Sequence, residues 1–86
     1  MFIEIISPEK KIYSGDVKLV QLPGTKSSFE LLNNHAAIIS TLRKGILRII
    51  ETSGSEKSFK INGGVMENKN NHIVVLVETP SAESNG

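Results

Sequence analysis

The sequence predicts an all-β protein, a small two-sheet β-sandwich of about ten short strands. Two observations lead to this fold class. Short runs rich in Ile, Val and Leu are separated by turn residues roughly every 8 to 12 positions. No apolar pattern with the helical period extends over the length of a helix. With 86 residues, the chain is expected to form one domain with a thin core.

The first quarter of the chain is predicted to alternate strands with tight turns. The expected elements are a strand at residues 2–7, a turn at 7–10, an extended piece at 11–13, a turn at 14–16 and a strand at 17–22. Pro8 favours the first turn because proline disfavours helical backbone in the residue before it. In the last strand, Val17 and Leu19 flank Lys18. This alternation predicts that Val17 and Leu19 share a buried face.

The stretch from Gln21 to Ser40 is the most irregular part of the sequence. It starts with a turn signal at Pro23-Gly24, continues with a polar run, and reaches Asn33-Asn34-His35-Ala36. Functional residues are concentrated in loops that a rigid scaffold positions. We therefore predict that this stretch is a functional loop and that the other strands form its scaffold.

The second half of the chain is predicted to consist of strands and hairpins. In order, we expect a strand at residues 36–42, a turn at 43–45, a hairpin of strands 46–52 and 58–62, a strand at 65–67, a turn at 68–71 and a strand at 72–78. The pair Gly63-Gly64 fits positive φ angles or a close backbone approach, or simply a bulge or tight turn. The predicted domain covers residues 1–79, followed by a flexible C-terminal tail at 80–86.

Two of the predicted strands are apolar on both faces, at residues 46–50 and 73–77. A strand of a two-layer sandwich buries only one face, so the second face needs a cover. A tightly wrapped barrel or overlying loops would provide it. A partner protein is the alternative, because large exposed apolar patches mark interaction sites.

Composition argues against several classes of function. The chain has no cysteine, which excludes disulfides and thiolate zinc sites. Its start lacks the features of a signal peptide, and no apolar run is long enough to span a bilayer. The net charge is +1, and the ten Lys and Arg residues are spread along the chain, which argues against nucleic-acid binding. The segment from Gly24 to Ser27 lacks the full phosphate-loop pattern, which argues against nucleotide binding there.

His35 is the residue that most resembles a catalytic group. A nucleophile site needs a base beside a serine or cysteine and an orienting acid, and no such motif surrounds His35. We interpret it as a structural histidine in a loop where Asn33 and Asn34 form local hydrogen bonds. A contact with a partner protein is the other interpretation. His72 lies far away in sequence, so no metal site is expected, and no catalytic residue or cofactor is predicted.

The segment Val20–Gly24, followed by Asn33–Ala36 and an apolar run, resembles the ε subunit of bacterial F-type ATP synthase. Further segments agree with this family in order and spacing, and together the resemblance covers residues 2–79. They are Ile5–Glu9 with Tyr13–Gly15, Gly45–Ile49, Asn62–Glu67 and Ile73–Glu78.

The resemblance implies a ten-stranded β-sandwich that serves as a non-catalytic rotor subunit in the central stalk. Such a subunit couples the γ subunit to the membrane c-ring for ATP synthesis driven by protons or sodium ions. It is peripheral to the cytoplasmic face of the bacterial inner membrane and does not insert into it. The residues that it assigns to the c-ring contact are Thr25, Lys26, Ser27 and Ser28. Those that it assigns to the γ contact are Ser7, His35 and Ser40. The alternative is an autonomous β-sandwich module that binds a ligand or a protein.

The sequence departs from the family pattern in two respects. Glu30 stands where the family usually has glycine, while Asn33 and Ala37 stand where it usually has proline, and these changes loosen the restraints on the loop backbone. The family commonly continues into a pair of inhibitory C-terminal helices, whereas this sequence stops at Gly86. We expect a naturally short form that lacks those helices and cannot inhibit itself with them.

Overall fold

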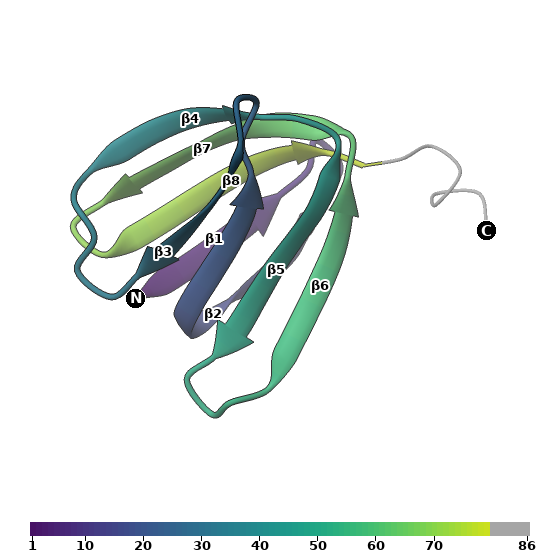
Figure 1. Cartoon of the computed structure of the whole chain (residues 1–86). Helices are drawn as coiled ribbons and strands as arrows, with labels where there is room; N and C mark the ends of the chain where they lie inside the picture. The colour runs from purple at the N-terminus through teal and green to yellow at the C-terminus, as the bar shows by residue number, and fades with distance from the viewer. Residues whose placement is uncertain (80–86) are drawn as a thin grey trace.

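The computed structural model describes residues 1–79, which form eight β-strands and no helix (Figure 1). The strands are β1 (Phe2–Ile6), β2 (Lys11–Pro23), β3 (Ser28–Leu32), β4 (Ile38–Leu42), β5 (Gly45–Glu51), β6 (Glu56–Ile61), β7 (Gly63–Lys69) and β8 (His72–Glu78). The predicted all-β fold class is confirmed, with eight strands in place of about ten. One reason for the smaller number is that β2 is a single strand of 13 residues. The predicted tail at 80–86 lies outside the described residues.

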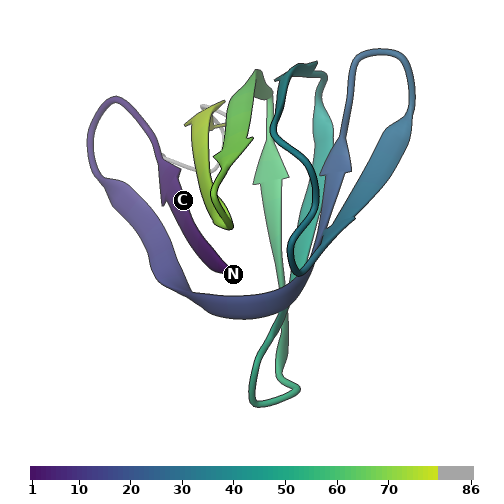
Figure 2. The same cartoon turned by 90° about the vertical axis from the view of Figure 1, so that its left-hand side faces the viewer.

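The strands form two layers that share β2. The hydrogen-bonded order is β4-β7-β8-β1-β2-β5-β6, and β3 also pairs with β2. The first half of β2 pairs with β1, and its second half pairs with β3 and β5. Sheet A therefore contains β4, β7, β8, β1 and the first half of β2, while sheet B contains the second half with β3, β5 and β6. Figure 2 shows β2 curving from one layer into the other.

A β-bulge gives β2 its change of direction. The register with β5 shifts between Val17 and Leu19, and an extra residue in a strand reverses the side-chain alternation and bends the strand. As a result, Val17 is buried, whereas Leu19 is only half-buried on the outer face. The prediction that these two residues share a face is wrong. The turn predicted at residues 14–16 is also wrong, because Gly15 lies within β2 opposite Ile3.

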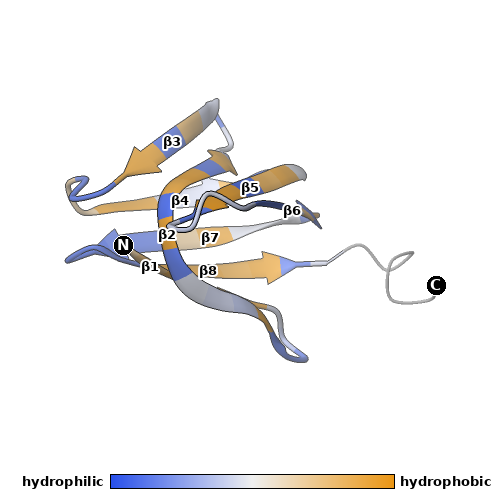
Figure 3. Cartoon of the chain, turned by 90° about the horizontal axis from the view of Figure 1, so that it is seen from below, coloured by the Kyte–Doolittle hydropathy of each residue, from blue (hydrophilic) through white to orange (hydrophobic). Residues whose placement is uncertain are grey.

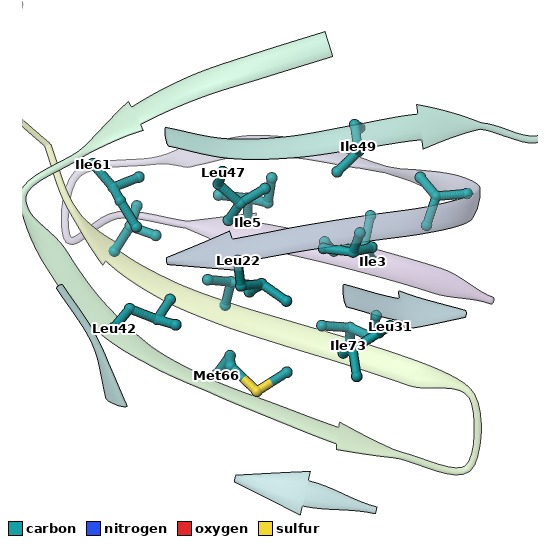
Figure 4. Packing of buried hydrophobic residues seen from close by; sticks show 14 residues of the cluster. Ile3, Ile5, Leu22, Leu31, Leu42, Leu47, Ile49, Ile61, Met66 and Ile73 are labelled. Atoms are coloured by element: carbon teal, nitrogen blue, oxygen red, sulfur yellow. The ribbon is translucent and has the colours of Figure 1, made fainter. Parts of the chain in front are cut away.

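The hydrophobic core fills the space between the two sheets. Ile3, Ile5 and Ile73 come from sheet A, and Leu22 and Ile49 come from sheet B. All five side chains are fully buried, and Figure 4 shows the two sets packed against each other. In Figure 3 the hydrophobic colour alternates with hydrophilic colour along several strands, as expected for strands with one buried face.

The predicted loop at 21–40 contains one strand that was not predicted, β3. The end of β2 and the start of β4, which also fall within 21–40, agree with the strands predicted at 17–22 and 36–42. The predicted turn at 68–71 is shorter, because only Asn70 and Asn71 connect β7 to β8, with φ angles of 53° and 64° that suit a two-residue hairpin turn. Gly64 lies inside β7 with φ 154°, and a Cβ added there would lie 2.2 Å from the Leu76 carbonyl oxygen. Of the alternatives considered for the glycine pair, the close backbone approach is therefore present at Gly64.

Candidate partner-binding surfaces

The β2–β3 turn forms a polar tip, which we define as Thr25, Lys26, Ser27 and Ser28. All four residues predicted for the c-ring contact are exposed and adjacent in this turn. In Figure 1 the turn projects beyond the strands at the top of the molecule. The structure thus places these four residues together on one protruding surface.

The polar tip is fixed to both sheets. The Thr25 backbone N–H donates to the Thr41 carbonyl oxygen at 3.1 Å, and the two threonine hydroxyl oxygens lie 2.9 Å apart. Gly24 forms an isolated bridge with Leu42 of β4, and the Arg43 Nε donates to the Gly24 carbonyl oxygen at 3.1 Å. Since β4 belongs to sheet A and β2 to sheet B, the turn is held from both layers.

Gly24 has no space for a side chain. An added Cβ would lie 2.5 Å from the Ser27 carbonyl oxygen and 2.9 Å from the Phe29 ring. The turn is therefore folded tightly over Phe29, and glycine permits this close approach. The Pro23-Gly24 pair was the sequence signal for the turn, and it marks the start of the tip correctly.

The outer face of sheet A carries a second surface, the apolar strip, which we define as Ile6, Ile39, Val65, Val74 and Leu76. Leu76 is paired with Ile6 on one side and Val65 on the other, so three apolar side chains lie side by side across β1, β8 and β7. Ile39 on the edge strand β4 is 71% exposed and is separated from Val74 by Glu67, and Leu76 is 49% exposed. An exposed apolar group of this kind is typical of a protein-contact surface.

A hollow lies at each end of the apolar strip. One, of about 390 Å³, is lined by Ile6, Ser7, Pro8, Leu76, Val77 and Glu78. The other, of about 300 Å³, is lined by Ala37, Ile38, Ile39, Glu67, Asn68 and Lys69. Neither lining contains an aromatic side chain on which a sugar or base could stack. The hollows are better suited to apolar side chains of a partner protein.

The three residues predicted for the γ contact do not form one cluster. Ser7 is only 6% exposed, and its hydroxyl donates to the Lys10 carbonyl oxygen at 3.1 Å within the β1–β2 turn. It lines the first hollow. His35 is exposed in the β3–β4 loop, beside the second hollow. Ser40 is half-buried and lies opposite buried Met66, on the inner side of β4.

Sequence reasoning therefore found two residues that lie beside the ends of the apolar strip, but not the strip itself. The available signal was the two-sided apolar pattern at residues 73–77, which is now explained by exposed Leu76 and half-buried Val74. The neighbouring Ile6 and Val65 could be found only from the strand register, because they come from distant parts of the chain.

Four asparagines connect the His35 loop to the β7–β8 hairpin. The Asn68 Nδ2 donates to the carbonyl oxygens of His35 and Ala36, both at 3.2 Å. Asn71 accepts from the Asn34 backbone N–H and donates to the Asn33 Oδ1, both at 2.8 Å. These bonds span more than 30 residues, whereas the sequence analysis predicted local ones. They tie the loop to β7 and to the β7–β8 turn at several points.

The described residues offer little for catalysis. Within residues 1–79 there is no group of three or more His, Cys, Asp or Glu side chains that could hold a metal ion. Burial, followed by a hydrogen bond to the Glu51 carboxylate, raises the pKa of Tyr13 to about 12, so this hydroxyl stays protonated at neutral pH. The Tyr13 ring also packs against Phe59. This group closes the side of the sandwich, and we assign it no chemistry.

The described residues thus form a β-sandwich with a braced polar tip at one end and an apolar strip on the outer face of sheet A. The family model for the β-sandwich domain of the ATP synthase delta/epsilon chain matches residues 1–83. The chain therefore belongs to this family of ATP synthase β-sandwich domains. Within residues 1–79 no helix is long and apolar enough to cross a membrane.

Curated relatives support this assignment. The chain is 36% identical over 76 residues to the ATP synthase epsilon chain of Campylobacter fetus, which covers 88% of this chain and 59% of the relative. It is 34% identical over 79 residues to the epsilon chain of Chlorobium limicola, which covers 92% and 90% respectively. The chain spans about half of the Campylobacter hominis epsilon chain, at 49% of its length and 38% identity.

Two solved structures share the fold. A chain in the central stalk and c-ring structure of the Tetrahymena thermophila mitochondrial ATP synthase superposes with a TM-score of 0.76 and 19% identity, over 91% of this chain and 63% of that one. A chain of the Euglena gracilis mitochondrial ATP synthase gives a TM-score of 0.78 and 16% identity, over 87% and 48%. At these identities the likeness establishes the sandwich fold alone.

Proposed function

We propose that this chain is a non-catalytic rotor subunit in the central stalk of an F-type ATP synthase. It couples the γ subunit to the membrane c-ring during ATP synthesis driven by protons or sodium ions. The observation that carries the proposal is the presence of two protein-contact surfaces of different chemistry on one small sandwich. A coupling subunit needs both, because it must contact a rotating shaft and a membrane ring at the same time.

The polar tip contacts the loops of the c-ring. Thr25, Ser27 and Ser28 offer hydroxyl groups, and Lys26 offers an ammonium group, all of them exposed. The tip is braced by bonds from Thr25 and Arg43, which suits a contact that transmits force. The fold likeness to a chain from a central stalk and c-ring structure supports this assignment.

The γ subunit covers the apolar strip of sheet A. Leu76 and Ile39 are the exposed anchors of this contact, and burial of such side chains supplies most of the free energy of an interface. Ser7 and His35 lie beside the hollows at the ends of the same contact. Ser40 contributes to the γ contact indirectly, because it lies opposite Met66 on the inner side of β4 and helps to fix the position of that strand.

The protein is a peripheral component at the cytoplasmic face of the bacterial inner membrane. Bacterial epsilon chains are among its relatives, and a partner of a membrane ring must lie at the surface of that membrane. It attaches through its protein partners and does not insert into the lipid.

Assembly tests the proposal. The chain should co-elute at equal stoichiometry with the γ subunit and c-ring of the same synthase, and its removal should reduce ion-driven ATP synthesis by reconstituted enzyme. A synthase that keeps γ and full coupling without this chain would contradict the proposal.

His35 separates a contact role from a catalytic one. We expect His35→Ala to weaken γ binding about threefold to tenfold, because His35 lies at the rim of the interface. Ser58→Ala is the control, since Ser58 is exposed on sheet B, opposite Arg48 and away from the apolar strip. Neither variant should lose a hydrolytic activity. A turnover that disappears with His35 would support the catalytic interpretation instead.

A further inference from the structure

Four cationic side chains that are dispersed in the sequence gather at the polar-tip end of the fold. We define the basic rim as Lys26, Arg43, Lys44 and Lys60. Lys26 belongs to the polar tip, and Arg43 and Lys44 form the β4–β5 turn, where the Arg43 backbone N–H donates to the Pro23 carbonyl oxygen at 2.8 Å. Lys60 on β6 is paired with Ile46 near the start of β5. The basic residues are spread along the sequence, but these four lie together at one end of the folded chain.

The basic rim has no ion-pair partner within residues 1–79. The ion pairs formed there are Arg48–Glu56, Lys57–Glu51 and His72–Glu4. On β3, the first acidic residue after the tip is Glu30, which is paired with Gln21 on the outer face of sheet B. All four rim residues are exposed. This end of the molecule therefore presents four cationic side chains without an ion pair in the described residues, and Glu78, opposite Gly63, is an acidic residue at the same end.

The guanidinium of Arg43 is held in place at the centre of the rim. Its Nε donates to the Gly24 carbonyl oxygen at 3.1 Å, one terminal nitrogen donates to the Ser28 hydroxyl at 3.4 Å, and the other donates to the Lys44 carbonyl oxygen at 3.4 Å. Arginine has five N–H donors, so about two remain for an incoming acceptor. A fixed fork of this kind is suited to carboxylate recognition.

We propose that the basic rim binds carboxylate-bearing protein loops, so that the c-ring loops facing this subunit carry Asp or Glu. This inference rests on the proposed function and specifies the chemistry of the partner at the same tip. A structured protein loop fits the rim better than a lipid surface does. The rim combines one immobilised guanidinium with the hydroxyls of Thr25, Ser27 and Ser28, which can bond to fixed acceptors at defined positions.

Lys26 and Lys44 are suitable for a test because their ammonium groups form no hydrogen bond or ion pair with the described part of the chain. We expect Lys26→Glu and Lys44→Glu each to lower the affinity for a complex of γ and the c-ring about threefold to tenfold at low salt. Lys18→Glu is the matched control, because Lys18 is exposed at the bulge of β2, away from the rim and from both hollows. It should change the affinity by less than about twofold.

Salt provides an independent measurement. Wild-type affinity for the γ and c-ring complex should fall as NaCl rises from about 50 to 500 mM, and the double variant Lys26→Glu/Lys44→Glu should lose most of this dependence. Rim variants that bind as wild type does, with the same salt dependence, would overturn the inference while leaving the proposed function intact. Failure of the wild-type chain to bind the complex at all would overturn the proposed function itself.

An experiment with lipid vesicles distinguishes protein carboxylates from lipid headgroups as the anionic ligand of the basic rim. Vesicles of phosphatidylcholine with phosphatidylglycerol should bind the chain weakly and equally in wild type and Lys26→Glu. If these vesicles bind the wild type as tightly as the ring complex does, and the rim variants abolish that binding, the carboxylate assignment is wrong and lipid headgroups are the ligand.

Discussion

The outer faces of the two sheets differ although their strands have the same architecture. On sheet B, a polar row crosses the centre of the face, where Arg48 donates to the Gln21 side-chain oxygen at 2.9 Å and lies 3.3 Å from the Glu56 carboxylate. On sheet A, Ile6 and Leu76 lie side by side at the corresponding place, and Leu76 is half exposed. Both faces combine a polar side-chain pair with exposed apolar groups, since sheet A also carries the His72–Glu4 pair and sheet B also exposes Leu32 and Ile46.

Each outer face carries one row of three apolar side chains, which are Ile6, Leu76 and Val65 on sheet A and Leu32, Leu19 and Ile50 on sheet B. On sheet B, Leu32 and Ile46 lie on opposite sides of the polar row and are separated by it. Single exposed apolar side chains are normal on soluble proteins. The two apolar rows differ in what lies beside them, because a hollow adjoins Ile6 and Leu76 on sheet A, whereas the polar row of Gln21 and Arg48 adjoins the row of sheet B.

The largest expected effect tests this difference directly. Leu76 and Ile46 are both 49% exposed, so Leu76→Arg and Ile46→Arg place the same charge at equally exposed sites on the two faces. We expect Leu76→Arg to lower the affinity for γ about 100-fold, as for an interface hot spot, and Ile46→Arg to change it less than about threefold. Isothermal titration with purified γ measures both.

Unfolding in urea is the control for that pair. Each variant should keep its free energy of unfolding within about 0.5 kcal/mol of wild type, since both sites are at the surface. Equal losses of γ affinity in the two variants would remove the distinction between the faces.

Asn68 tests how the sheet A surface is shaped. It is 1% exposed, and its amide holds the carbonyls of His35 and Ala36, while its own Oδ1 is buried without a partner in the described residues. We expect Asn68→Ala to lower the free energy of unfolding by about 2 kcal/mol, because two carbonyls lose their donor. Urea denaturation gives the value, and exposed Asn62→Ala is the control, with little change expected.

The same Asn68→Ala variant should release the His35 loop. Amide exchange in residues 33–37 should become faster, whereas the strands of sheet B should keep their protection. Unchanged exchange in the loop would mean that the Asn71 bonds alone fix it.

The hydrogen bond that joins the two sheets at Tyr13 provides a third test, in which stability is measured against pH. Tyr13 on the sheet A half of β2 donates to Glu51 of β5 in sheet B, and the folded-state pKa of Tyr13 is about 12, above the ordinary 10.0. The unfolded chain therefore ionises first, so the stabilising contribution is complete below pH 10 and is lost as the pH rises to 12. Tyr13→Phe should show a smaller fall in the free energy of unfolding over this range, measured by urea titrations at each pH. The prediction would be contradicted if the free energy of unfolding fell by the same amount in wild type and in Tyr13→Phe over this pH range.

The smallest expected effect concerns the polar row of sheet B. Arg48→Ala should lower the free energy of unfolding by less than about 1 kcal/mol and leave γ affinity unchanged, since the Arg48–Glu56 pair is partly exposed. A double-mutant cycle with Glu56→Ala isolates the pair. A loss of γ affinity in Arg48→Ala would place the γ contact on sheet B.

Most of the strands could be predicted because their Ile, Val and Leu residues alternate or form short runs between turn residues. The β3 strand was missed although Phe29 and Leu31 alternate with Ser28 and Glu30, because the strand is short and lies between two stronger turn signals. The bulge at Lys18 could not be predicted, since it depends on which residues of β5 lie opposite.

The surfaces were predictable to different degrees. The polar tip is a contiguous segment with a turn signal, so the four residues that the resemblance assigns to the c-ring contact lie together in the fold. The apolar strip and the basic rim each collect residues from several strands or turns, as Ile6 and Leu76 illustrate. Only the strand pairing brings such residues together, and pairing between distant segments leaves no local mark in the sequence.

The continuity of β2 has a mechanical consequence for a rotor. A torsional load that enters at the tip, beyond Pro23, passes along one covalent backbone into the layer that bears the apolar strip. The Gly24–Leu42 bridge closes a second path across the opposite edge. Relative sliding of the two layers would require these backbone links to stretch as well as side chains to slip. In the proposed role, the domain should therefore behave as a stiff body between the γ subunit and the c-ring, and elastic energy would be stored in those two partners.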